Sequence, residues 1–99
     1  MQITLVRSGG LAGLRTDVSV NTDELPRKEA AEIAGLVHQV GLEDLARRSP
    51  IRGRGADRFQ YDLTVQDAEQ RLKATVAEDA ASPELQQLIS RLLQLPRSG

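Results

Sequence analysis

The sequence predicts an α+β fold: a four-stranded antiparallel sheet with two helices packed on one face, in the order β-β-α-β-β-α. Four segments alternate apolar and polar residues, which is typical of strands with one buried face. Two other segments carry apolar residues at i, i+3, i+4 and i+7, which is typical of amphipathic helices. Each element thus has one apolar side, and placing both helices on the same face of the sheet buries these sides together.

The first two strands are expected over residues 2–7 and 14–20, paired as a β-hairpin. Ile3 and Leu5 share one face of the first strand, and the second strand alternates in the same way. The connection, residues 8–13, contains three glycines, and glycine adopts positive φ angles without steric cost. Two alternating runs joined by a short glycine-bearing loop are typical of a hairpin.

The first helix is expected to begin at Pro26 and to end at Gly41. Proline suits the first helical position because its missing N–H would have no partner there, and glycine suits the C-terminal cap. Residues 42–48 are expected to add one or two helical turns, and residues 49–56 should form a loop because they contain proline and glycine. The apolar stripe of this helix consists of Ala30, Ile33, Ala34, Val37 and Val40.

A second hairpin and a second helix complete the predicted fold. Residues 59–65 show the clearest strand alternation in the chain, and residues 71–76 are expected to pair with them. Ser82 and Pro83 begin the last helix as its cap and its first residue, and Pro96 ends it. This helix should be the main helical contributor to the core. Its large apolar residues are Leu85, Leu88, Ile89, Leu92 and Leu93.

Length and composition limit the class of protein. With 99 residues, the chain is expected to form a single domain over residues 1–99. It has no cysteine, which excludes disulfides, cysteine-based zinc sites and thiol chemistry. A formal net charge of −1 provides no overall attraction to nucleic acid or to a membrane. The opening MQITLVRSGG lacks the basic and apolar regions of a signal peptide, so we expect a cytoplasmic protein.

The side chains that carry chemistry do not predict an enzyme. His38 is the only histidine, and it has no metal-ligand or triad partner at local spacing. The glycines of residues 8–13 are followed by a strand, whereas a phosphate-binding loop needs a helix there. Carboxylates occupy outward positions on the predicted strands and helices. We therefore expect no catalytic residue, no metal site and no cofactor.

An arginine-rich segment supports an alternative function, a module that binds RNA or another anion. Its arginines are Arg47, Arg48, Arg52, Arg54 and Arg58. The slightly acidic net charge argues against this function, as does an aromatic content limited to Phe59 and Tyr61. A solvated loop is the simpler interpretation of residues 47–58.

The turn of the first hairpin combines leucine with glycine. Leu11 and Leu14 lie beside three glycines, and Arg7 and Arg15 flank them. A structural explanation is available, with glycine serving the turn and leucine the edge of the core. An exposed leucine on a backbone-rich loop is, however, also what a protease cleft binds.

Three segments carry a resemblance to a known family. They are residues 3–15 (ITLVRSGGLAGLR), residues 57–65 (DRFQYDLTV) and the helix start at residues 82–85 (SPEL). The chain resembles the emfourin family, which are small protein inhibitors of thermolysin-like (M4) zinc metalloproteases encoded beside protealysin-type enzymes. The Ser-Gly-Gly-x-Ala-Gly-Leu run is the most specific part of this resemblance.

The resemblance implies a reversible, non-covalent inhibitor that is not an enzyme. Its partner would be a thermolysin-like or protealysin-like zinc metalloprotease, whose substrate cleft it occupies, and not a nucleic acid or a membrane. The functional surface of the family is placed at the N-terminal hairpin region. In this sequence that region maps onto Arg7, Ser8, Gly9, Gly10, Leu11, Ala12, Gly13, Leu14 and Arg15.

Overall fold

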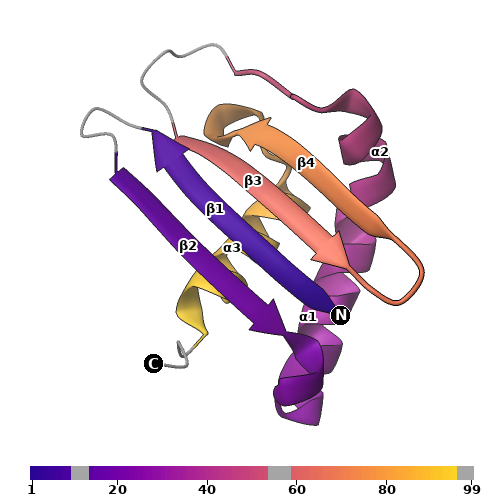
Figure 1. Ribbon diagram of the computed structural model, residues 1–99. Helices are drawn as coiled ribbons and strands as arrows, with labels where there is room; N and C mark the ends of the chain where they lie inside the picture. Colours follow the sequence, from indigo (N-terminus) through magenta and orange to yellow (C-terminus); the bar gives the residue numbers. More distant parts are fainter. Residues whose placement is uncertain (10–13, 54–58, 96–99) are drawn as a thin grey trace.

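The computed structural model describes residues 1–9, 14–53 and 59–95, and in this part of the chain it confirms the predicted α+β fold (Figure 1). The strands are β1 (Gln2–Gly9), β2 (Leu14–Asn21), β3 (Phe59–Gln66) and β4 (Arg71–Ala77). The helices are α1 (Arg27–Val40), α2 (Leu42–Arg48) and α3 (Pro83–Gln94), with the short 3-10 helices η1 (Thr22–Glu24) and η2 (Glu78–Ala80). Within the described ranges, no helix is long and apolar enough to cross a lipid bilayer.

The sheet joins the two predicted hairpins through their first strands. Its order is β2-β1-β3-β4, and all neighbours are antiparallel. Strand β1 therefore has a partner on both sides, and Leu5 stands opposite Val18 of β2 and Leu63 of β3. The pairing of β1 with β3 connects segments that are distant in the sequence, and it makes one sheet out of two local units (Figure 1).

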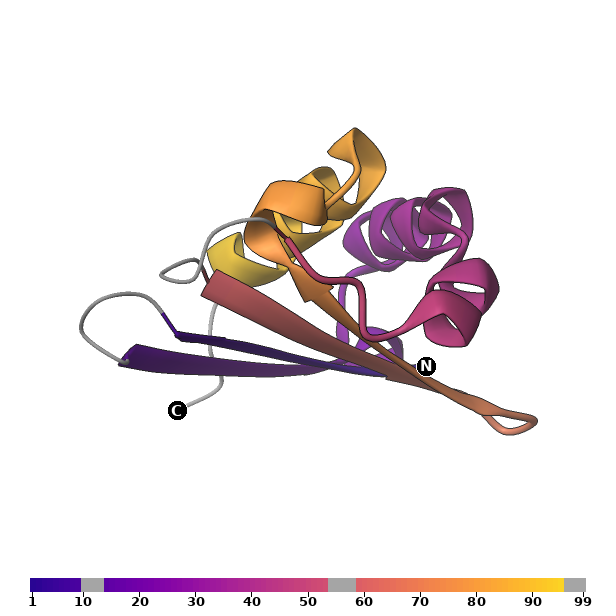
Figure 2. The same ribbon diagram turned by 90° about the horizontal axis from the view of Figure 1, so that it is seen from above.

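The helices lie on one side of the sheet, as predicted (Figure 2). We call this side the helix face and the opposite side the open face. Strand residues point alternately to the two sides, so Ile3 and Leu5 are buried on the helix face. The open face is mostly polar: Thr75 donates a 2.6 Å hydrogen bond to Asp62 there. The alternation seen in the sequence thus corresponds to a real division of the sheet into two faces.

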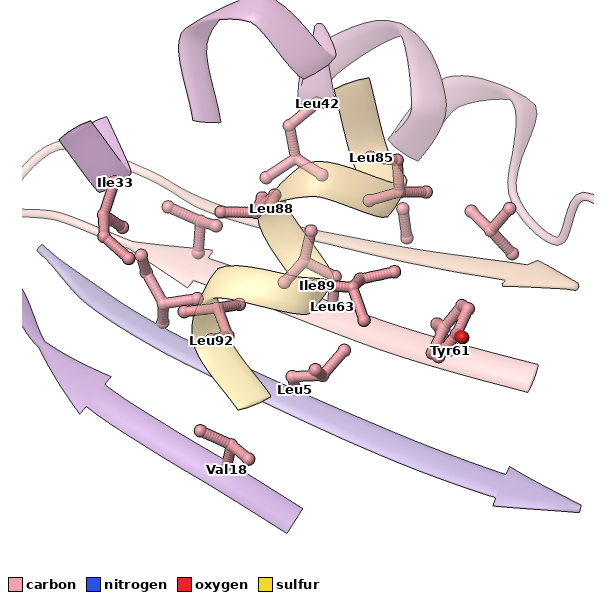
Figure 3. Packing of buried hydrophobic residues seen from close by; sticks show 14 residues of the cluster. Leu5, Val18, Ile33, Leu42, Tyr61, Leu63, Leu85, Leu88, Ile89 and Leu92 are labelled. Atoms are coloured by element: carbon pink, nitrogen blue, oxygen red, sulfur yellow. The ribbon is translucent and has the colours of Figure 1, made fainter. Parts of the chain in front are cut away.

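Helix α3 is the main helical contributor to the core, as predicted (Figure 3). Its buried residues are Leu85, Leu88, Ile89 and Leu92. In contrast, Ile33 is the buried residue of α1 and Leu42 that of α2. The predicted apolar stripe of α1 is wrong at Ala34, which is exposed. Helix α1 packs mainly on α3 and not directly on the sheet. A narrower part of the α1 surface is therefore buried than the sequence pattern predicts.

The helix ends follow local sequence signals. The Ser82 hydroxyl accepts a 3.2 Å hydrogen bond from the backbone N–H of Leu85 and caps α3. Gly41 ends α1 with a φ of 70°, in the left-handed region that favours glycine. Pro26 lies one position before α1 and not at its first residue, because its extended backbone makes it the cap. Its carbonyl accepts the first helical hydrogen bond, from the N–H of Ala30 at 2.9 Å.

The segment expected to be a loop after α2 contains a short strand-like contact. The Ile51 N–H donates a 2.8 Å hydrogen bond to the Thr75 carbonyl, and the Ala77 N–H donates one of 2.8 Å to the Ile51 carbonyl. The Ser49 hydroxyl accepts a hydrogen bond from the Thr75 N–H at 2.9 Å. These contacts cover the outer edge of β4 near its end, where unpaired backbone groups would otherwise be available to another chain.

Truncation of Leu88 tests the role of α3 in the core. The Leu88 side chain is 0% exposed, so Leu88→Ala should lower the free energy of unfolding by about 2–5 kcal/mol, through lost burial and a cavity. Gln87→Ala on the exposed side of the same helix should change it by less than about 0.5 kcal/mol. Urea unfolding followed by circular dichroism measures both, and similar effects of the two substitutions would contradict the packing described above.

Candidate functional site

The proposed contact residues gather at one end of the sheet. Gly9 pairs with Leu14 of β2 and with Phe59 of β3, so the last residue of β1 and the first residues of β2 and β3 meet there. We call this region the hairpin end. Four of the predicted site residues lie outside the described residues: Gly10, Leu11, Ala12 and Gly13. The other five are placed by β1 and β2.

The pleat of the sheet separates the two arginines of the predicted site. Arg7 stands opposite Thr16 and Tyr61, on the helix face. Ser8 stands opposite Arg15, and both point to the open face. Arg15 is exposed and its Nε donates a 2.9 Å hydrogen bond to the Asp17 carboxylate. The two arginines that flank the turn in the sequence therefore lie on opposite faces of the sheet.

Arg7 is half-buried and packs against an aromatic ring. Its guanidinium carbon lies 4.4 Å from the centroid of the Phe59 ring, a distance at which the ring attracts a cation. The Nε atom of Arg7 is enclosed and has no hydrogen-bond partner within residues 1–9, 14–53 and 59–95. In the described part of the chain, no carboxylate forms an ion pair with this guanidinium. The cation is thus held mainly by its contact with Phe59.

Tyr61 adjoins this arginine across the strand pair and lies at the margin of the buried cluster (Figure 3). Its side chain is 8% exposed. Burial raises the pKa of Tyr61, and Glu78 raises that pKa further by its charge and as a hydrogen-bond partner, while the charge of Arg7 lowers it. Arg7, Phe59, Tyr61 and Glu78 therefore form one polar and aromatic cluster at the hairpin end, which we call the Arg7 cluster.

Most of the Arg7 cluster was not predicted as part of the site. In the sequence, Phe59 and Tyr61 occupy alternating positions of a predicted strand, and no local pattern marks Glu78. One signal in the sequence points to the cluster: Ile3, Leu5 and Arg7 occupy successive positions on the same face of β1. A charged residue in a row of buried positions indicates a special environment, because burial of an unpaired charge is unfavourable.

In the described part of the arginine-rich segment, Arg47 and Arg48 form ion pairs. In α2, Asp44 forms ion pairs with Arg47 at 3.6 Å and with Arg48 at 3.2 Å. Arg52 is exposed, and Arg54 and Arg58 lie outside the described residues. The ion pairs within α2 reduce the positive charge that this segment offers to an anion, and they weaken the alternative of RNA or anion binding.

The histidine and two hollows of the described surface add no functional group to the hairpin end. His38 is exposed on α1. In the ranges that the structure describes, no three histidine, cysteine or acidic side chains gather closely enough to hold a metal ion. A groove of about 600 Å³ lies between α1 and α3, beside Gly35 and Leu36, and a hollow of about 470 Å³ lies near Met1 and His38. Neither is lined by residues of the hairpin end.

Comparison with known proteins identifies a protein family. The family model described as Emfourin matches residues 5–93, which include most of β1, all of β2 and the Arg7 cluster. No curated protein and no solved structure shows significant similarity to the chain. The match covers most of the 99 residues, so it concerns the whole arrangement of sheet and helices and not the glycine-bearing turn alone.

Gly9 tests the backbone at the hairpin end, and Gly35 in α1 serves as its comparison. Gly9 has a φ of 101°, so Gly9→Ala should lower the free energy of unfolding by about 1–2 kcal/mol. Gly35 lies in α1 with open space where a Cβ would stand, so Gly35→Ala should raise it by about 0.5–1 kcal/mol. Urea unfolding compares the same added methyl group at both positions. Stabilisation by Gly9→Ala would show that the strand end has another conformation.

The raised pKa of Tyr61 predicts a pH dependence. The folded protein keeps Tyr61 neutral above the ordinary pKa of 10.0. The resulting stability is fully present below pH 10.0 and is lost as the pH rises through the folded-state pKa. Tyr61 is the only tyrosine and the chain has no tryptophan, so phenolate absorbance reports this group alone.

The titration midpoint of the folded protein should therefore lie above 10.0. Glu78→Gln should lower the midpoint, because it removes the negative charge beside the phenol. An unchanged midpoint in this variant, or a wild-type midpoint at or below the ordinary tyrosine value, would contradict the described surroundings of Tyr61.

Proposed function

Because this chain belongs to the emfourin family, we propose that it inhibits thermolysin-like (M4) zinc metalloproteases by binding non-covalently in their substrate cleft through the N-terminal hairpin region. Membership of this family indicates a protease-inhibitor role. The observation that carries the proposal is the family match over residues 5–93, because it spans the hairpin strands together with the scaffold that holds them. The target class follows from the resemblance of residues 3–15 to this inhibitor family.

The proposed contact surface runs from Arg7 to Arg15. The ends of β1 and β2 reach past the helices in the view of Figure 2, which favours access by a partner. Strand β1 is paired on both sides up to Gly9, so the base of the turn is held in place before binding. A preorganised segment loses less conformational entropy on association, and its affinity is higher for that reason.

In the proposed mechanism the inhibitor binds as an uncleaved substrate does. Thermolysin-like enzymes favour a bulky aliphatic residue just beyond the scissile bond, and Leu11 or Leu14 is assigned to that pocket. The glycine-rich backbone pairs with the edge of the cleft in extended form. The bound loop covers the zinc of the protease and excludes the attacking water. The inhibitor itself contributes shape and hydrogen bonds, and the enzyme contributes all of the chemistry.

Titration of protease activity tests this function. Purified chain added to thermolysin and to a protealysin-like enzyme should abolish peptide hydrolysis at close to one inhibitor per enzyme. Leu11→Ala or Leu14→Ala should weaken inhibition about tenfold or more, because a buried leucine contact contributes more than about 1 kcal/mol. Gln87→Ala, on the exposed side of α3, is the matched control and should inhibit like the unmodified chain.

Two outcomes would contradict the proposal. Full hydrolysis at excess inhibitor with both enzymes would exclude this target class. Undiminished inhibition by both leucine variants, with the fold intact by circular dichroism, would exclude the assigned contact. Tight RNA binding that falls steeply with salt would instead support the alternative function of residues 47–58.

A further inference from the structure

We propose that Arg7 binds a carboxylate side chain of the target protease, next to the cleft contact made by the turn. This inference rests on the proposed inhibitory function and adds a charged contact to it. It assigns to the helix face at the hairpin end a role in recognition, and it specifies the chemistry of the group on the partner. The leucine contact of the proposed function, by contrast, requires no carboxylate on the protease.

The first argument is the position of Arg7 in a row of buried residues. Ile3 is 1% exposed and Leu5 is 0% exposed, and Arg7 follows them on the same face of β1. An apolar residue at this position would continue the core and would avoid the desolvation of a charge. A half-buried arginine here is therefore unfavourable for folding alone, unless its charge is used by a partner.

The second argument is that the guanidinium packs on an aromatic ring but forms no ion pair with any of the described residues. Phe59 supports one side of it, at 4.4 Å from the ring centroid. Glu78 interacts with the hydroxyl of Tyr61, and among the described residues neither Glu78 nor another acidic residue forms an ion pair with Arg7. The Nε atom is enclosed and has no hydrogen-bond partner among the described residues.

The third argument is the match between this geometry and a carboxylate. A guanidinium presents its N–H groups in a planar fork, which binds the two oxygens of a carboxylate side by side. Stacking on Phe59 restricts the arginine side chain before binding, so less rotamer entropy is lost when the pair forms. Arg7 lies two positions before Gly9, the last residue of β1, so a partner that binds at the hairpin end comes close to the side chain of Arg7.

The second arginine of the hairpin region differs in each of these respects. Arg15 is exposed, points to the open face and already donates to Asp17 at 2.9 Å. An exposed ion pair of this kind contributes little to either folding or binding. In the part of the chain that the structure describes, Arg7 packs on an aromatic ring without an ion pair, whereas Arg15 is exposed and paired, although both flank the same turn.

Inhibition constants against thermolysin test the inference. Arg7→Met keeps an apolar side chain on Phe59 but removes every donor, and it should weaken inhibition about 30-fold or more, as loss of one member of a desolvated charge pair does. Arg7→Lys should recover part of this loss, because lysine retains the charge but not the fork. Arg71→Met, an exposed arginine on β4 at the far end of the sheet, is the matched control and should leave inhibition unchanged.

A double-mutant cycle identifies the partner group. Each aspartate and glutamate around the protease cleft is replaced by its amide, and each enzyme variant is assayed with wild-type and Arg7→Met inhibitor. One amide variant should be nearly insensitive to Arg7→Met, since the interaction is already absent. High salt should reduce the difference between the wild-type and Arg7→Met inhibitors.

The outcomes separate this inference from the proposed function. If the wild-type chain inhibits, and folded Arg7→Met inhibits equally well or no carboxylate couples to Arg7, the inference is wrong and the inhibitory function stands. If the wild-type chain fails to inhibit, the proposed function and the inference that rests on it are both wrong. If Arg7→Met unfolds in urea far more easily than the wild type, the double-mutant cycle is carried out with Arg7→Lys, which conserves the cation.

Discussion

The pairing of β1 on both sides is the constraint on which the rest of the molecule depends. Through it, two hairpins that could each form locally become one four-stranded sheet. A single hairpin has little independent stability in water, whereas a sheet with an apolar face can bind a layer of helices. Leu5 at the centre of β1 is 0% exposed, and α3 covers this region. The position of Gly9 between Leu14 and Phe59 follows from the same pairing.

The division of the sheet into two faces determines how charge is distributed at the hairpin end. Because successive strand residues point to opposite sides, Arg7 extends the row of Ile3 and Leu5, while Arg15 joins the polar open face. Position on a face, and not distance from the turn, decides which arginine is half-buried. One end of the sheet thereby combines a solvated surface with a half-buried cation in contact with an aromatic ring.

An inhibitor that supplies no chemistry depends on how well its contact surface is held before binding. The core is aliphatic, and the chain has no cysteine, so stability comes from burial and hydrogen bonding. Against this background, a half-buried arginine whose Nε atom is enclosed is locally unfavourable for folding. Proteins commonly retain such unfavourable groups where function requires them. The Arg7 cluster fits that pattern. Within it, Tyr61 and Glu78 interact with each other, whereas the guanidinium of Arg7 has no ion pair among the described residues.

Local patterns in the sequence determined the elements and their ends. Alternation predicted the four strands and their buried faces, and Ser82 and Gly41 marked helix boundaries that the structure confirms. These signals act between residues a few positions apart, so they are legible without a partner segment. The neighbour of β1, the bridge formed by Ile51 and the contact of Arg7 with Phe59 were decided by the tertiary structure. Alternation states which side of a strand is buried, but not which distant strand lies beside it. Only the packing of distant segments determines whether a charged side chain contacts water, an aromatic ring or another charge.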